Sequence, residues 1–94
     1  MQIQHVENES QKGEFYYEVD GKKLAMMTYS KAGKDKIIID HTEVDSSLQG
    51  KGIGYELVAE AVDFARKNNI KIMPLCPFAA SVFRKTSDYN NVKF

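Results

Sequence analysis

The chain has 94 residues, which is enough for one domain and too few for two. Hydrophobic residues make up 43% and charged residues 28%, which is the composition of a globular protein rather than a disordered one. Lysine and arginine total 13, as do aspartate and glutamate. The chain therefore lacks the positive net charge that is typical of nucleic-acid-binding domains.

The remaining features of composition concern the compartment. The single cysteine, Cys76, cannot form an internal disulfide, as expected in a reducing compartment. No apolar run approaches the roughly 20 residues that a membrane-spanning helix needs, and the first ten residues are too polar for a signal peptide. We expect a cytoplasmic protein with one domain, residues 1–94, that contacts neither a membrane nor nucleic acid.

The first half of the chain has the period-two hydrophobic pattern of β-strands. Strands are expected at Gln2–Val6, Glu14–Asp20, Leu24–Tyr29 and Lys36–Val44. Asp20-Gly21 suits the positive φ angles of a tight hairpin turn. The run Ile37–Ile39 is apolar on both faces and predicts a central strand. Short connections between the strands predict an antiparallel meander of about four strands.

The second half changes to helical spacing. Apolar residues recur on one helical face from Ile53, and Asn68-Asn69 can end that helix. A strand over Ile70–Leu75 follows, in which Pro74 should leave one side unpaired. Pro77 suits the first position of a short helix that ends near Lys85. The predicted fold class is α+β, with the meander followed by helix, strand and helix.

The glycine-rich loop is the most informative segment. It reads Gln49-Gly50-Lys51-Gly52-Ile53-Gly54 and lies between a predicted buried strand and the long helix. Glycines let a ligand approach the backbone, and the free N–H groups of a helix start attract anions. A lysine at this place is unfavourable for the helix dipole unless an anion is bound. The spacing excludes both a nucleotide P-loop and the dinucleotide-binding fingerprint, whereas a glycine-rich turn without a ligand stays an alternative.

The same loop resembles the Gln/Arg-x-x-Gly-x-Gly/Ala signature of the GNAT N-acetyltransferase superfamily. The segments His41–Val44 and Pro74–Phe78 extend the likeness to small GNAT domains of the YidJ type, over roughly Lys36 to Tyr89. The resemblance implies a compact GNAT fold that binds acetyl-CoA where two strands splay apart. The implied cofactor-binding residues are Val44, Gln49, Gly50, Lys51, Gly52, Ile53 and Gly54. The helices that normally lie between the first two strands of the superfamily have no counterpart here, which implies an open acceptor site.

Three residues are candidates for catalysis. Cys76 is expected at the start of the last helix, where the helix dipole favours the nucleophilic thiolate, although a free cysteine is more often a small buried hydrophobe. His41 is expected to share the strand face of Ile37 and Ile39, as general base or as a packed core residue. Glu43 is expected on that same face, where it either pairs with His41 or meets an amine substrate.

Overlaying the superfamily pattern places Phe83 where a tyrosine usually protonates the leaving thiolate. Tyr89 or water is then left to replace that tyrosine. The resemblance thus implies an N-acetyltransferase that moves the acetyl group of acetyl-CoA to an amine, directly or through Cys76. The alternative is a CoA-binding regulatory or interaction module with little catalysis. No metal site is expected, and the sequence identifies neither the amine nor the oligomeric state.

Overall fold

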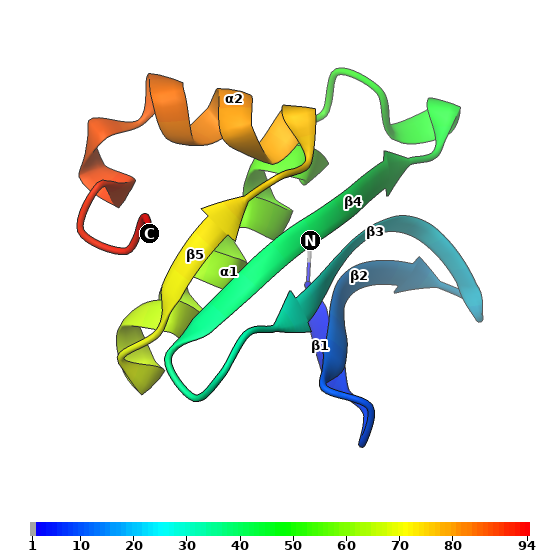
Figure 1. Cartoon of the computed structure of the whole chain (residues 1–94). Helices are drawn as coiled ribbons and strands as arrows, with labels where there is room; N and C mark the ends of the chain where they lie inside the picture. Colours follow the sequence, from blue (N-terminus) through cyan, green and yellow to red (C-terminus); the bar gives the residue numbers. More distant parts are fainter. Residues whose placement is uncertain (1) are drawn as a thin grey trace.

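The computed structural model describes residues 2–94, which form a five-stranded sheet with two α-helices (Figure 1). The strands lie in the order of the chain and the first four run antiparallel, whereas β5 is parallel to β4. The elements are β1 (Gln4–Glu7), β2 (Lys12–Val19), β3 (Lys22–Lys31), β4 (Lys36–Val44), α1 (Ile53–Asn68), β5 (Lys71–Pro74) and α2 (Pro77–Lys85). The predicted meander followed by helix, strand and helix is confirmed. No helix within these residues is both long and apolar enough to cross a membrane.

Helix α1 covers one face of the sheet and builds the core with it (Figure 1). Its apolar stripe is buried, as the helical spacing predicted, and packs with buried side chains of β2 to β5. Gly52 caps its N-terminus with φ = 77°, and Asn69 caps its C-terminus with φ = 55°. The fully buried partners on the strands include Phe15, Met27, Ile37, Ile39 and Ile72.

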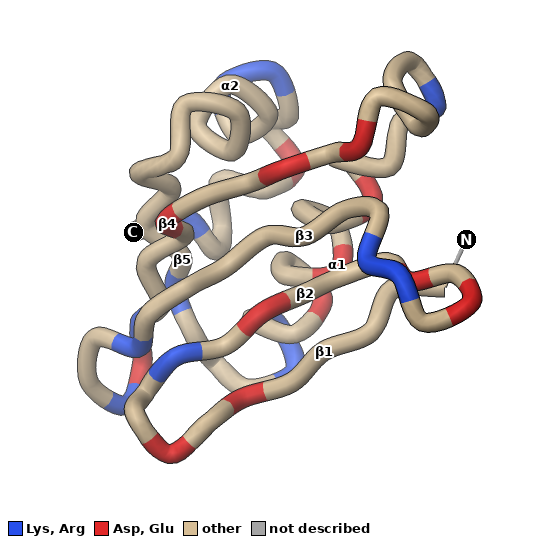
Figure 2. Tube along the Cα trace, turned by 90° about the vertical axis from the view of Figure 1, so that its right-hand side faces the viewer, with Lys and Arg blue, Asp and Glu red and all other residues tan. Residues whose placement is uncertain are grey.

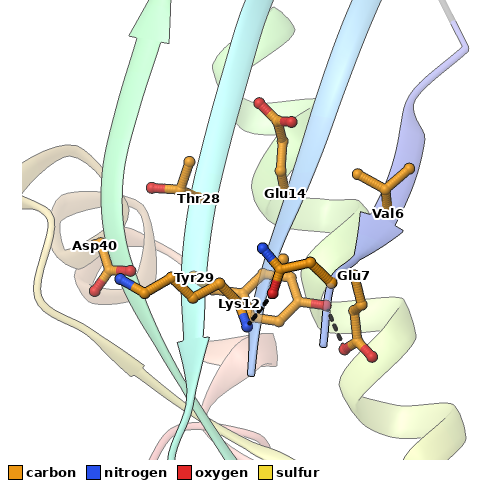
Figure 3. Close-up of a pocket in the computed structure, with 9 residues that line it drawn as sticks. Val6, Glu7, Lys12, Glu14, Thr28, Tyr29 and Asp40 are labelled. Carbon is orange, nitrogen blue, oxygen red and sulfur yellow. Dashed lines mark hydrogen bonds between the residues drawn. The ribbon is translucent and has the colours of Figure 1, made fainter. Parts of the chain in front are cut away.

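The opposite face of the sheet, here called the open face, has no helix from residues 2–94 over β1 to β3. A row of side chains crosses it in register, from Val6 through Glu14 and Thr28 to His41. Val6 is 49% exposed, so this apolar side chain does not anchor β1 in the core. A groove of about 640 Å³ lies at this row, and Figure 3 shows Lys12 extending across it toward Asp40.

A β-bulge in β4 decides which residues face the core. Tyr29 pairs with Ile39, but Thr28 pairs with His41, so Asp40 is an extra residue without a partner on β3. Beyond the bulge, the alternation of side chains is reversed. The expectation that His41 and Glu43 share the face of Ile37 and Ile39 is therefore wrong. Both lie on the open face, with side chains 59% and 66% exposed.

The splay between β4 and β5 begins at the same level. Their pairing ends at Ile39 and Pro74, while β4 continues to Val44 without a neighbour from β5. The amides of Leu75 and Cys76 both donate to the carbonyl of Ile39 and turn the chain away into α2. This agrees with the break in pairing that Pro74 predicted, because proline has no N–H to continue the ladder.

A polar cluster joins the edge strand β1 to the core. The Tyr29 ring packs against Gly13, where a side chain would overlap it, so the ring reaches across β2. Its hydroxyl donates to Glu7 Oε2 at 2.6 Å and contacts His5 Nε2 at 2.5 Å. The His5 ring stacks on Phe15 at 4.2 Å between centroids. His5 is thus a structural contact between β1 and the core.

Candidate functional site

The loop that follows β4 is held at its start by Asp45. The carboxylate accepts hydrogen bonds from the backbone N–H of Ser47 at 3.0 Å and from its hydroxyl at 2.6 Å. Both hydrogen bonds lower the pKa of Asp45, and the one from the Ser47 hydroxyl has the larger effect. They stabilise the short 3₁₀ turn η1 (Ser46–Leu48), and this turn leads the chain into the glycines.

Two glycines of the loop adopt a conformation that other residues avoid. Gly50 has φ = 79° and Gly52 has φ = 77°. The amide of Lys51 donates back to Leu48, whereas those of Gly52 and Ile53 have no backbone acceptor within residues 2–94. A Cβ atom at Gly50 or Gly52 would meet nothing within 4 Å. The left-handed turns therefore leave N–H groups at the start of α1 free for an anionic ligand.

Gly54 serves a different purpose from the other two glycines. It is buried in the first turn of α1, and a Cβ atom there would lie 2.6 Å from Cζ of Phe78 on α2. Its small size thus allows α1 and α2 to approach each other. The structure gives Gly54 a packing role beside the cofactor-binding role that the motif implied.

A pocket of about 450 Å³ lies between the loop and the unpaired end of β4. Six of the seven predicted cofactor-binding residues line it, namely Val44, Gln49, Gly50, Gly52, Ile53 and Gly54. The side-chain amide of Gln49 donates to the carbonyl of Val44 at 3.3 Å, which ties the loop to the strand. The predicted loop residues therefore do form one side of a single pocket.

Lys51 is the predicted residue that does not line this pocket. It is exposed, and it is the only basic residue along the connection from β4 to α1, where Figure 2 shows a lone blue segment. Its position next to the free amides adds positive charge at the mouth of the pocket. This arrangement suits a ligand with negatively charged groups.

Cys76 is the N-cap residue of α2, directly before Pro77, as predicted. Its side chain is 5% exposed and does not line the pocket. The thiol donates a hydrogen bond to Oγ1 of Thr42 at 3.2 Å, across the gap between β4 and α2. Thr42 does line the pocket, so it lies between the thiol and the pocket interior.

The structure brings His41 and Glu43 together but not with Cys76. Nε2 of His41 lies 3.7 Å from Oε1 of Glu43 on the open face. Thr42 lies between them in the chain and points to the pocket side. Because the pairing of β5 with β4 ends at Ile39 and Pro74, His41 and Glu43 lie on β4 beyond the last of these pairs, next to the splay.

Neither Phe83 nor Tyr89, the two positions considered for a tyrosine that acts as general acid, lines the pocket. Phe83 is buried at 2% exposure. The Tyr89 ring lies 5.6 Å from that of Phe83 and 5.9 Å from the guanidinium of Arg66. Arg66 is in the last turn of α1, about 20 Å along the helix from the glycine loop. Tyr89 is therefore at the wrong end of α1 to act at the pocket.

Four pocket residues were missed by the sequence interpretation. They are Thr42, Leu48, Tyr55 and Phe78, and the rings of Tyr55 and Phe78 contact each other edge to face at 5.6 Å between centroids. Tyr55 is 49% exposed, directly after the glycine motif, so its position next to the motif was an available signal. Thr42 had no such signal, because only the bulge turns it toward the pocket.

Comparison with known proteins agrees with this architecture. A family model described as GCN5-related N-acetyl-transferase matches residues 14–92. The protein NATD1 of Mus musculus is 31% identical over 72 residues, which cover 76% of this chain and 66% of that protein. The matched part of the chain thus spans slightly less than two thirds of that curated relative.

Solved structures share the fold. The solution structure of a GCN5-like putative N-acetyltransferase from Staphylococcus aureus has a TM-score of 0.76 and 34% identity, covering 99% of this chain and 87% of that one. A GNAT family acetyltransferase from Elizabethkingia anophelis with acetyl-CoA bound has a TM-score of 0.59 at 14% identity, over 68% and 42% of the two chains. With a family model that covers most of its length and a splayed sheet followed by a glycine loop, this chain belongs to the GCN5-related N-acetyltransferase family.

Proposed function

We propose that this protein binds acetyl-CoA in the pocket beside the glycine loop and transfers its acetyl group to an amine. The observation that carries the proposal is the pair of left-handed glycines, Gly50 and Gly52, which leave amides free at the N-terminus of α1. These amides and Lys51 would hold the pyrophosphate. The acyl arm would then lie along β4, from Val44 toward Thr42, where the pocket continues.

Acetyl-CoA supplies a thioester, whose carbon–sulfur bond breaks as the amine nitrogen bonds to the carbonyl carbon and the sulfur keeps the electron pair. The chain must remove a proton from the amine. His41 and Glu43 are the groups proposed for this step, since they lie together on the open face beside the splay. The sulfur takes a proton from water, because Phe83 cannot donate one and Tyr89 lies elsewhere.

Transfer directly to the amine is the route that the site favours. A route through Cys76 needs the sulfur to reach the thioester carbon, but the thiol is 5% exposed and Thr42 lies between it and the pocket. The indirect route remains the competing version of the proposal, and it predicts an acetyl group on Cys76. Mass spectrometry after incubation with acetyl-CoA distinguishes the two routes.

A second candidate function is a CoA-binding module with little catalysis. Two observations favour it: the buried Phe83 in place of a tyrosine acid, and the high exposure of the His41–Glu43 pair. Such a module would bind CoA and acetyl-CoA equally well and acetylate no amine. The two functions therefore share the pocket and differ in turnover.

The first test is titration of the isotope-labelled protein with acetyl-CoA while the amide chemical shifts are recorded. The second test measures acetylation of a panel of amines. The largest shifts are expected at Gly50 to Ile53. Turnover should fall in His41→Ala while acetyl-CoA affinity stays the same. Should millimolar acetyl-CoA leave the loop amides unchanged, both candidate functions are wrong. Binding without turnover on any amine supports the module.

A further inference from the structure

Thr42 occupies the end of the pocket that lies farthest along β4 from the glycine loop. It pairs with Met27, which is fully buried against the core, so its side chain lies on the α1 side of β4. It is also the first residue on that side after the last pair between β4 and β5, Ile39 with Pro74. The bulge at Asp40 is what brings a hydroxyl to this place.

The hydrogen bonding of Thr42 leaves its own proton available. Oγ1 accepts the hydrogen bond from the Cys76 thiol at 3.2 Å, and no other side-chain hydrogen bond to it occurs within residues 2–94. A hydroxyl has one donor and two acceptor lone pairs, so accepting from sulfur still leaves the O–H free to donate. Since a β-branched side chain has few rotamers, the contact with Cys76 holds Oγ1 in place while its O–H can still turn toward a ligand.

We propose that Thr42 is a further catalytic residue, whose hydroxyl donates a hydrogen bond to the carbonyl oxygen of the bound acetyl thioester. The inference rests on the proposed function, because phosphates at Gly50 and Gly52 place the acyl group at the opposite end of the pocket. Cys76 acts as a positioning residue that orients Thr42, and not as the nucleophile. The hydrogen bond strengthens as the carbonyl oxygen gains negative charge during attack by the amine.

The test measures the carbonyl directly, so that it needs no knowledge of the acceptor. Acetyl-CoA labelled with ¹³C at the carbonyl is bound to the protein, and the carbonyl stretch is recorded by isotope-edited infrared difference spectroscopy. The reference is the carbonyl stretch of the thioester in a dry solvent that donates no hydrogen bonds. In wild type and in Thr42→Ser, the stretch of bound acetyl-CoA should lie at a lower frequency than this reference. Thr42→Val, which has the same shape without the hydroxyl, should lose that shift. Thermal unfolding checks that both variants are folded.

Kinetics on any amine that the panel identifies give the second measurement. Thr42→Val should lower kcat by roughly 10- to 100-fold with little change in acetyl-CoA affinity, because removal of one donor to a developing oxyanion has effects of that order or larger. Thr42→Ser should restore the rate. Cys76→Ala should keep turnover with a several-fold loss, since it only loosens the orientation of Thr42.

Two results would overturn the inference alone. One is a carbonyl stretch that is the same in Thr42→Val as in wild type while acetyl-CoA is bound. The other is an acetyl group found on Cys76 together with complete loss of turnover in Cys76→Ala, because the thiol would then be the nucleophile. Absence of any bound carbonyl signal in wild type would instead refute the proposed function, and the role of Thr42 with it.

Discussion

Replacing Gly52 with alanine separates the backbone requirement of the loop from its role in binding. At φ = 77° an L-residue is strained by about 1–2 kcal/mol. Alanine also restricts the unfolded chain more than glycine does, and this stabilises the folded state by about 0.4–1 kcal/mol. Because a Cβ atom there meets nothing within 4 Å, no steric cost is added. The net loss should be about 1 kcal/mol, which lowers Tm by roughly 4–8 °C in a domain of this size.

Gly21→Ala is the matched control for this variant. Gly21 has φ = 79° in the turn between β2 and β3, and a Cβ atom there also meets nothing within 4 Å. Both variants should lose the same stability in thermal unfolding. Only Gly52→Ala should weaken acetyl-CoA binding, by about tenfold or more, because the methyl group stands at the free amides and each hydrogen bond to a charged group contributes about 1.5–3 kcal/mol.

Calorimetric titration of both variants with acetyl-CoA tests whether the loop amides bind the ligand. Equal affinity in Gly52→Ala and Gly21→Ala would show that the loop amides do not hold the ligand. A much larger loss of stability in Gly52→Ala than in Gly21→Ala would instead refute the strain argument, since the two φ angles are nearly the same.

Further predictions concern charge, pH and packing. Lys51→Glu should weaken acetyl-CoA binding while Tm stays the same or rises, because an acidic residue suits a helix N-terminus; Lys34→Glu in another exposed loop should leave the affinity unchanged. Desolvation lowers the pKa of His5, so the unfolded chain takes up the proton first and stability should decrease as the pH falls below about 6.5. His5→Gln should remove this decrease in urea unfolding measured between pH 7 and pH 5, and an unchanged profile would contradict the assignment. Gly13→Ala should lower the unfolding free energy by about 1–3 kcal/mol because the new Cβ overlaps the Tyr29 ring, and a neutral effect would refute that contact.

Local sequence patterns were sufficient for the elements and for the loop. The helical spacing after Ile53, the stop at Asn69 and the turn at Asp20-Gly21 each depend on the φ angles or the hydrophobic faces of neighbouring residues. The same holds for Gly50 and Gly52, whose left-handed conformation few other residues adopt. Pro74 predicted the end of pairing with β4, because the missing N–H is a property of the residue itself.

The orientation of the candidate catalytic groups depended on the tertiary structure. One extra residue in β4, Asp40, moves His41 to the open face and Thr42 to the pocket, and strict alternation along the sequence cannot reveal such a shift. The bulge exists only in the register with β3. The hydrogen bond between Cys76 and Thr42 likewise joins residues 34 positions apart. Contacts of this kind arise from strand pairing and helix packing, so they are decided only when the whole chain has folded.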